Sequence, residues 1–370
     1  MIIDRVEAIP YRIAMRKPMR FASGQVDEMG HVLLRIGTSD GIVGVADIPP
    51  RPYTYGETQA GVVTVIDTLF APALRGADPL DRSRINAQLH RTVGNAAAKG
   101  GVDIALWDII GQALDQPVHR LLGGFTDGLR VSHMVGFASG PQMVAEALEY
   151  RSRYGIAVFK VKVGRRPLRL DIDAVRALRE ALGPDVELYL DANRGWTADE
   201  AMRVLDATAD LGLTCFEEPC DAAEVMGRRR LVSHARIPVV ADESVPTLGD
   251  AAREIITGGA TALSIKTART GFTDSAKILG LAEGLGIEVI MGNQIDTQIG
   301  STATVTFGAA FAHSSRRAGE LSNFLDMADD LIAEPLRIID GRVAAPTTPG
   351  VGARIDDDKL AHFRLDQRVA

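Results

Sequence analysis

Four ionisable side chains follow one another along this chain at nearly even spacing. Asp191, Glu217, Asp242 and Lys266 are separated by 26, 25 and 24 residues. Each lies at the end of a short apolar run with β-branched or aromatic residues, which is typical of a buried strand. A step of about 25 residues accommodates one strand, one helix and two short connections. The spacing therefore predicts successive parallel strands that present these groups at one level.

Three carboxylates at one level repel one another unless a cation lies between them. Ligation by oxygen alone, from Asp191, Glu217 and Asp242, favours Mg²⁺ or Mn²⁺ over zinc. A simpler interpretation is that Asp191 and Asp242 cap the helices that follow them, which is a common use of aspartate. The even spacing of the whole set favours one divalent metal ion.

A lysine pair precedes the carboxylates, in the stretch FKVKVG at residues 159–164. Lys160 and Lys162 alternate in a predicted strand, so both side chains project from the same face. On a buried face, two ammonium groups require compensating negative charge. Because Lys266 follows the carboxylates, the lysines flank the acidic centre on both sides. We expect all three to face a metal-containing site as bases or electrostatic stabilisers.

Polar residues near these positions are candidate substrate contacts. Asn193 lies two residues after Asp191, and the stretch GNQID supplies Asn293 and Asp296. His133 interrupts the apolar run RVSHMVGF. It is a further candidate contact, although a histidine packed inside the protein is the more common use.

Two more glutamates directly neighbour the predicted metal ligands. Glu218 follows Glu217, and Glu243 follows Asp242. On an ideal strand each would point away from its neighbour. We therefore expect them to support the ligands from behind, or to act as charges at helix N-termini.

Strand–helix alternation extends over residues 128–325. About eight such units in roughly 200 residues predict a (β/α)₈ barrel, whose active sites lie at the C-terminal ends of the strands. An open doubly wound sheet is the alternative, but the G-x-G-x-x-G fingerprint is missing. The apolar runs are RVSHMVGF, AVFKVKVG, VELYLDAN, LTCFEEP, IPVVADES, ALSIKTA, IEVIMGN and a weaker eighth near Ala318–Leu321.

Mixed strand and helix patterns before the barrel predict a separate α+β domain at residues 1–127. Its stretch PPRPYTYGET, rich in proline and aromatic residues, is typical of an ordered loop. Residues 326–370 carry the apolar stretch Pro335–Ile339 and the turn DGRV. We expect this last segment to return to the first domain.

Composition excludes several classes of protein. The 370 residues include 41 basic and 48 acidic side chains, a formal net charge of −7, which gives no basic surface for nucleic acid. No apolar run is long enough to span a membrane. Only two cysteines occur, Cys215 and Cys220, and the N-terminus lacks the layout of a signal peptide. We expect a cytoplasmic enzyme.

These motifs resemble the muconate lactonizing branch of the enolase superfamily, and most of all its actinobacterial type. The resemblance covers essentially the whole chain. It is carried by VFKVKVG, LDANRGW, CFEEP, ADES, SIKTARTG, VDIALWDIIGQALDQPVHRLLGG and DGRVAAPTTPGVGARID.

The resemblance implies an α+β domain that caps the barrel mouth and a metal ion held by the three carboxylates. It also implies that Lys162 and Lys266 lie on opposite faces of the substrate, with Lys160 as an electrostatic helper. Relatives share one step, in which a carbon acid next to a carboxylate loses or gains a proton and the metal stabilises the enediolate.

The reaction is less fully specified than the fold. The candidates are muconate cycloisomerase, o-succinylbenzoate synthase, N-acylamino acid racemase and dipeptide epimerase. The stretch GELSNF lacks the D-x-D typical of dipeptide epimerases, whereas PRPYTYGET resembles a capping loop of muconate cycloisomerases. Asp296 departs from the branch, which more often has glutamate at this seventh-strand position.

The resemblance therefore implies cycloisomerisation of cis,cis-muconate to muconolactone in aromatic catabolism. The substrate would be a small dicarboxylate enclosed by capping residues, and we expect a homo-oligomer. A catalytically silent ligand-binding barrel and a Schiff-base aldolase are disfavoured, because neither needs all the acids and lysines. The capping residues are Phe21, Ser23, Arg51 and Tyr55.

Overall fold

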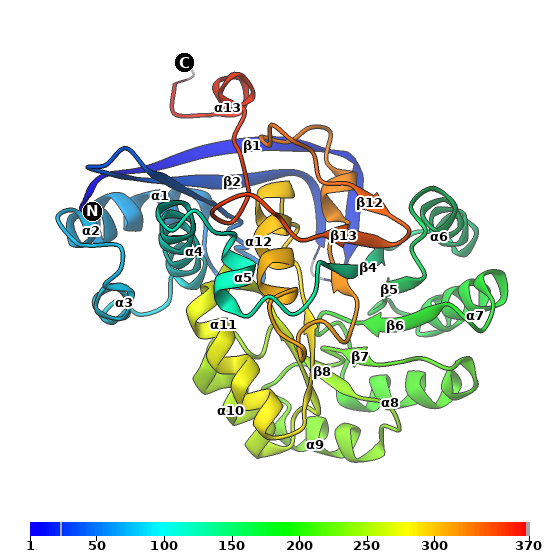
Figure 1. Ribbon diagram of the computed structural model, residues 1–370. Coiled ribbons are helices and arrows are strands. Elements are labelled where there is room, and N and C mark those ends of the chain that lie inside the picture. Colours follow the sequence, from blue (N-terminus) through cyan, green and yellow to red (C-terminus); the bar gives the residue numbers. More distant parts are fainter. Residues whose placement is uncertain (23, 368–370) are drawn as a thin grey trace.

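The computed structural model describes residues 1–22 and 24–367, and Figure 1 shows their arrangement. A three-stranded antiparallel sheet near the N-terminus lies beside a ring of parallel strands. The sheet has the order β1 (Ile3–Phe21), β2 (Gly24–Thr38) and β3 (Val43–Ile48). Strands β1 and β2 form one long hairpin, in which pairing extends from Ile3 with Thr38 to Phe21 with Gly24.

Helices pack against the N-terminal sheet. The longest, α4, is buried along most of its length and crosses β3 closely. A Cβ atom on Gly44 would come within 2.1 Å of the Ala105 carbonyl oxygen, so only glycine permits this approach. The helices are α1 (Gln59–Val65), α2 (Ala71–Leu74), α3 (Arg82–Leu89), α4 (Ala96–Ala113) and α5 (Val118–Leu122), with a π-helical turn at Ile66–Phe70.

The predicted barrel is confirmed. Strands β4 to β10 pair in parallel in chain order, and β11 pairs with β4. At the closure, β11 also lies beside β10, since a Cβ atom on Gly319 would come within 3.4 Å of Met291. The strands are β4 (Gly128–Val135), β5 (Val158–Lys162), β6 (Glu187–Asp191), β7 (Phe216–Glu217), β8 (Val239–Ala241), β9 (Ala262–Ile265), β10 (Glu288–Met291) and β11 (Gly319–Glu320).

A helix follows each of the first seven barrel strands and covers the outside of the ring (Figure 1). Apolar side chains on one face of each helix pack on the strands, which is the pattern expected of amphipathic helices. The helices are α6 (Gly140–Tyr154), α7 (Arg169–Leu182), α8 (Ala198–Ala207), α9 (Val225–His234), α10 (Leu248–Thr257), α11 (Thr267–Gly284) and α12 (Gln298–Gly308), with 3₁₀ turns at Ala209–Leu211 and Asn323–Asp326.

The C-terminal segment contacts both parts of the chain. The hairpin of β12 (Ile338–Ile339) and β13 (Arg342–Ala344) adds to the edge of β4 in antiparallel pairing. Helix α13 (Asp357–Phe363) then lies beside β1, and the Leu365 amide donates to the Pro10 carbonyl. The predicted domain boundaries, at residues 127 and 325, stay a prediction.

Within the described ranges, no helix is both long enough and apolar enough to cross a membrane.

Candidate active site

The three predicted metal ligands lie side by side at the ends of adjacent strands. Asp191 ends β6 and is in register with Glu217, which ends β7, and Asp242 follows β8 directly. All three are at most 1% exposed. Neither aspartate caps a helix, because Thr197 caps α8 and Thr247 caps α10. The simpler interpretation of these two aspartates was therefore wrong.

The lysine pair of β5 faces the same centre. Lys160 Nζ donates to Glu217 Oε1 at 2.6 Å and lies 2.8 Å from Asp191 Oδ2. Lys162 Nζ donates to Asp191 Oδ2 at 2.6 Å and to Asn193 Oδ1 at 2.7 Å. Both lysines are almost fully buried, so the carboxylates supply the compensating charge that burial demands.

Lys266 approaches from the other side of the ring. It follows β9, which lies four positions from β5 among the strands β4 to β11, so the two strands are diametrically opposite. The Lys266 ammonium group donates to Asp242 Oδ2. Lys162 and Lys266 thus face each other across the barrel mouth, and both line the cavity there.

The electrostatics of this cluster keep most of its groups charged. Burial alone would raise the pKa of Asp191, but the Lys160 and Lys162 ammonium groups outweigh burial and hold that pKa at about 2. Burial alone would lower the pKa of Lys266, yet Asp242 raises it above its usual range. Glu217 differs, since burial and the neighbouring carboxylates raise its pKa well above normal despite Lys160.

The residue types at this centre fit a hard divalent cation. Glu217 Oε2 is buried and has no hydrogen-bond partner among the described residues. Three adjacent carboxylates supply oxygen alone, which Mg²⁺ and Mn²⁺ prefer. In this structure a lysine ammonium group pairs with one oxygen of each of these three carboxylates. Accordingly, no group of three acidic, histidine or cysteine side chains in the described chain is arranged as a metal cage.

Two capping segments close the mouth. Phe21 and the loop that carries Arg51 and Tyr55 line the cavity together with the barrel lysines. The Arg51 guanidinium lies 5.6 Å from the centre of the Phe21 ring, and its only hydrogen bond in the described chain is a long one, 3.7 Å, to Met29 Sδ. This cation has no ion pair in the described chain and lines the cavity, where it can bind an anion.

The mouth is nearly full in this closed form. Its free volume is about 40 Å³, room for a few water molecules. Besides Lys160, Lys162, Asp242 and Lys266, the predicted residues that line the cavity are Phe21, Arg51, Tyr55, Asn193, Glu243 and Asn293.

Glu243 differs from the prediction made for it. It lines the cavity, and its Oε1 accepts a hydrogen bond from Asn193 Nδ2 at 2.7 Å. Strand β8 ends at Ala241, so the alternation of an ideal strand no longer governs residue 243. Burial and the negative charge of Asp242 raise the pKa of Glu243 to about 7.

Two predicted substrate contacts lie away from the cavity. His133 faces the outside of β4, where it stacks on Tyr150 at 3.7 Å and pairs with Glu146 at 3.0 Å. Its neighbour Met134 lines the cavity instead. Asp296 lies behind the seventh-strand loop, where its Oδ1 accepts from the Gln294 amide. The sequence could not predict which way these two side chains point. Asp296 lies in the turn after β10, and which face of β4 looks into the barrel depends on how the ring closes.

Ser23, the remaining predicted contact, lies outside the described residues.

Glu218 supports Asp242 from behind, as predicted, although it lies just beyond β7, which ends at Glu217. Its Oε1 accepts from the Asp242 amide at 2.6 Å and from the Ser244 amide at 2.9 Å. Its Oε2 accepts from Arg228 Nη1 at 3.0 Å, and Arg228 is itself only 1% exposed. This network fixes the backbone that carries Asp242.

Sequence reasoning missed two charged residues of the cluster. Glu320 of β11 accepts from Lys160 Nζ at 2.6 Å and from the Asn293 amide at 3.1 Å. Arg269, in the first turn of α11, donates to Asp242 Oδ1 at 2.9 Å. The available signals were an acid inside the weak eighth strand and an arginine one helical turn after Lys266.

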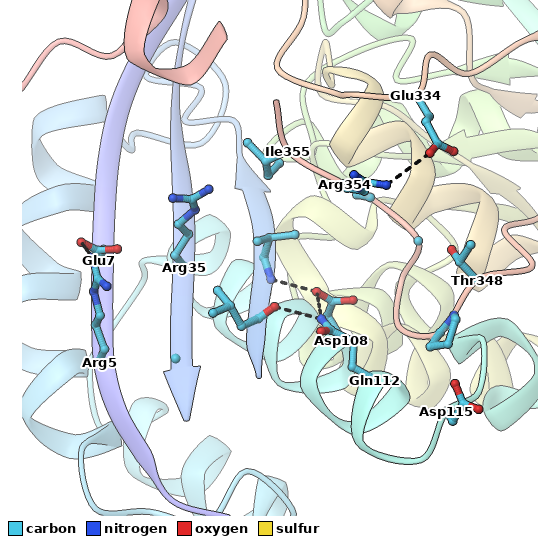
Figure 2. A pocket seen from close by; sticks show the side chains of 16 residues that line it. Arg5, Glu7, Arg35, Asp108, Gln112, Asp115, Glu334, Thr348, Arg354 and Ile355 are labelled. Carbon is cyan, nitrogen blue, oxygen red and sulfur yellow. Dashed lines mark hydrogen bonds and ion pairs between the residues drawn. The ribbon is translucent and has the colours of Figure 1, made fainter. Parts of the chain in front are cut away.

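A larger depression, of about 660 Å³, lies on another part of the molecule, between the N-terminal sheet and the C-terminal segment (Figure 2). Asp108 of α4 holds its two sides together, because it accepts from the Val45 amide at 2.9 Å and from the Val351 amide at 2.7 Å. The arginines that line it each pair with a carboxylate, as Arg354 does with Glu334 at 3.6 Å. Its arginines are thus paired within the chain, which indicates a structural seam.

Comparison with known proteins agrees with this geometry. Residues 5–123 match the mandelate racemase / muconate lactonizing enzyme N-terminal domain, and residues 142–359 match the enolase C-terminal domain-like family. A muconate lactonizing enzyme from Mycobacterium smegmatis, solved in complex with muconolactone, is 56% identical with a TM-score of 0.98. That comparison covers 99% of this chain and 100% of the other.

Curated relatives include enzymes of more than one reaction. A chloromuconate cycloisomerase from Cupriavidus pinatubonensis is 31% identical over 97% of this chain and 99% of its own length. An L-Ala-D/L-Glu epimerase from Bacillus subtilis is 30% identical over 95% of this chain and 96% of its own length. Because both domains and these full-length relatives match, the chain belongs to the enolase superfamily, in the family of mandelate racemase and muconate lactonizing enzyme.

Proposed function

We propose that this enzyme catalyses the cycloisomerisation of cis,cis-muconate to muconolactone. The observation that carries the proposal is the pair of buried lysines, Lys162 and Lys266, on opposite sides of one closed cavity beneath the unpaired Arg51 guanidinium. Such a site offers proton donors to both faces of a small planar anion. The similarity to a muconate lactonizing enzyme solved with muconolactone supports this choice of substrate.

The enclosed residues suit a dicarboxylate. Arg51 can form a charge-assisted hydrogen bond with one substrate carboxylate. Asn293 Nδ2 is a buried donor that has no partner in the described chain and lines the same cavity. A second oxygen acceptor from the substrate would satisfy it, because an unmade buried hydrogen bond is costly.

Lactone formation from muconate requires one proton donor. An oxygen of one carboxylate adds to the far double bond, and the electron pair moves to the carbon next to the other carboxylate. An ammonium hydrogen from Lys162 or Lys266 then bonds to that carbon, which leaves a neutral amine that solvent reprotonates. The opposite lysine keeps its charge and stabilises the anion in a water-poor site.

Asp191, Glu217 and Asp242 are the residues that would hold Mg²⁺ or Mn²⁺. Bound there, the ion would stabilise negative charge as it develops on the substrate carboxylate. Lys160 would remain among these acids and compensate their surplus charge, including that of Glu320.

A racemase of N-acylamino acids is the second candidate, and the same lysine pair favours it. A racemase needs one lysine on each face of the substrate, as acid and as base, and an N-succinyl-L-Arg/Lys racemase from Bacillus cereus is 26% identical to this chain. An o-succinylbenzoate synthase would use a similar centre. Cycloisomerisation and racemisation therefore differ in which substrate hydrogen each lysine exchanges, and not in where the lysines lie.

Turnover decides between these candidates. The purified enzyme is given cis,cis-muconate, an N-succinyl amino acid or the o-succinylbenzoate precursor, each with Mg²⁺ or Mn²⁺. We expect lactone formation as the fastest reaction by at least about 100-fold. Arg51→Ala should raise KM for muconate by about tenfold or more, as expected when a charged hydrogen bond is lost. Faster racemisation than lactonisation would contradict the proposal.

A cytoplasmic location and a homo-oligomeric state complete the proposal. Fractionation of the native cells and the mass of the purified enzyme in solution test them separately.

A further inference from the structure

The capping loop that carries Arg51 and Tyr55 separates two spaces. On its inner side lies the small cavity with the lysines. On its outer side lies a depression of about 670 Å³ that shares Phe21, Arg51 and Thr54 with the cavity. The closed cavity has about 40 Å³ free, far less than a dicarboxylate such as muconate needs. The wall between the two spaces must therefore move when substrate binds.

The loop is held in place by few polar contacts with the barrel. Its turn is internal, because the Thr54, Tyr55 and Gly56 amides all point to the Arg51 carbonyl at 2.7–3.2 Å. Gln294 Nε2 donates to the Pro49 carbonyl at 3.2 Å, at the start of the loop. At its tip, the Tyr55 hydroxyl is the group that contacts the barrel.

Arg269 is the barrel residue that makes the shorter of two hydrogen bonds to this hydroxyl. Its Nη1 donates to Tyr55 Oη at 2.5 Å and to Asp242 Oδ1 at 2.9 Å, and its Nη2 donates to the Ser264 carbonyl at 3.1 Å. The guanidinium carbon lies 5.2 Å from the centre of the Tyr55 ring. Arg269 is 3% exposed, so the contact forms in a dry environment, where a charged hydrogen bond is strong.

Lys266 lies at the same contact. Its ammonium group is 3.4 Å from Tyr55 Oη and donates to the other oxygen of Asp242. A single guanidinium thus links the tip of the loop to the residue that anchors Lys266. Lys162, on the opposite side, hydrogen-bonds only to Asp191 and Asn193 of the barrel in the described chain, and it meets the cap through the Phe21 ring, whose centre is 5.8 Å from Nζ.

We propose that Arg269 is a positioning residue that fastens the capping loop shut through Tyr55, and so sets substrate access and water exclusion on the Lys266 side of the cavity. The kinetic part of this inference rests on the proposed function. The part that concerns loop closure does not.

The test compares Arg269→Met, Tyr55→Phe and the double variant by amide hydrogen exchange of the full chain. We expect exchange at Thr54, Tyr55 and Gly56 to be about tenfold faster in each single variant, since each loses the Arg269–Tyr55 hydrogen bond and Tyr55→Phe also loses the longer one from Lys266. The double variant should exchange no faster than the faster single variant. Arg269→Lys, which keeps the charge, should lie between wild type and Arg269→Met. Arg176→Met, which removes an exposed arginine paired with Asp210, is the control and should leave this loop unchanged.

Kinetics with cis,cis-muconate give the second measurement. Tyr55→Phe removes one hydroxyl and leaves Asp242 paired, so it should raise KM about tenfold while kcat falls less than about threefold. Loop exchange at the wild-type rate in Tyr55→Phe, or a double variant whose increase is the product of the single ones, would overturn the inference. Tyr55→Phe decides the matter if Arg269→Met fails to fold. If muconate is not a substrate, the proposed function fails, and loop exchange still tests the role of Arg269.

Discussion

Glu217 and Glu218 are neighbours in the chain, are both fully buried, and have opposite surroundings. Glu217 faces the barrel mouth, where it shares Lys160 with other acids and leaves Oε2 without a partner in the described chain. Glu218 faces the other way, where Arg228 and the backbone amides of Asp242 and Ser244 occupy both of its oxygens.

The difference separates two uses of buried charge. A buried polar atom without a partner costs about 1–3 kcal/mol, so a protein keeps one where a ligand or ion can satisfy it. A fully satisfied network instead rigidifies its surroundings. Glu217 therefore belongs to a region built to bind, and Glu218 to a region built to hold the binding groups in place.

The largest expected effect lies in the binding region, at the lysines. Lys162→Ala and Lys266→Ala should each lower lactone formation, by about 10²–10⁴-fold for the proton donor. Loss of the donor should also abolish exchange of the lactone α-hydrogen with D₂O. Loss of the other lysine should slow both reactions and leave the stereochemistry of deuteration intact.

Lys277→Ala, an exposed lysine of α11, is the matched control and should keep full activity. If each lysine variant instead lost exchange with a single enantiomer of an N-acyl amino acid, the racemase would be established.

The next effect lies in the supporting region. Arg228→Met leaves the buried Glu218 carboxylate without its cation, which should lower the free energy of unfolding by about 3–5 kcal/mol. Arg230→Met, in the same helix, removes an exposed arginine paired with Asp199 and should change stability by less than about 1 kcal/mol. Urea denaturation of both variants measures the difference, and equal midpoints would show that the buried network contributes little.

A smaller effect distinguishes Glu217 from a glutamate outside the site by the response to metal. At a Mg²⁺ or Mn²⁺ concentration 100 times the dissociation constant, the ion should stabilise the wild type by about 2.7 kcal/mol. Glu217→Gln should lose most of this gain. Glu187→Gln, at the opposite end of β6 from Asp191, should keep it. Thermal melts with and without the ion test this, and an unchanged metal response in Glu217→Gln would remove Glu217 from the ligand set.

The sequence predicted the barrel and the order of its acids because one structural unit repeats about every 25 residues there. It could not identify Glu320, since β11 is only two residues long and its apolar signal is weak. Nor could it identify Arg269, because an arginine in the first turn of a helix usually faces solvent, whereas this one turns inward to Asp242.

The side-chain directions of residues just beyond strand ends could not be predicted from the sequence. Glu243 turns into the cavity and Asp296 turns away from it, although both follow a strand by a few residues. Ile295, which precedes Asp296, has a φ of +64°, a left-handed conformation that β-branched residues rarely adopt. A period of two residues predicts facing only inside a strand, so these positions depend on how the loops pack.

Asp296 is a third buried carboxylate, and in the described chain it has neither an ion-pair partner nor a full set of hydrogen-bond donors. It is 1% exposed, and burial together with the charge of Asp47 raises its pKa to about 7. An unfolded aspartate has a pKa near 4, so the folded state binds this proton more tightly. Between about pH 4 and pH 7 the folded state therefore loses stability as pH rises, and above pH 7 the loss is complete.

Asp296→Asn removes this titration and resembles the protonated acid in shape. From pH 5 to pH 8, its free energy of unfolding should therefore rise relative to wild type by on the order of 2–3 kcal/mol. Glu243 and Asp108 titrate in the same range, but they do so in both proteins and cancel in the difference. Urea denaturation at the two pH values measures the change. A difference that is the same at pH 5 and pH 8 would mean that Asp296 is ionised throughout, and hence that a cation from the mouth reaches it after all.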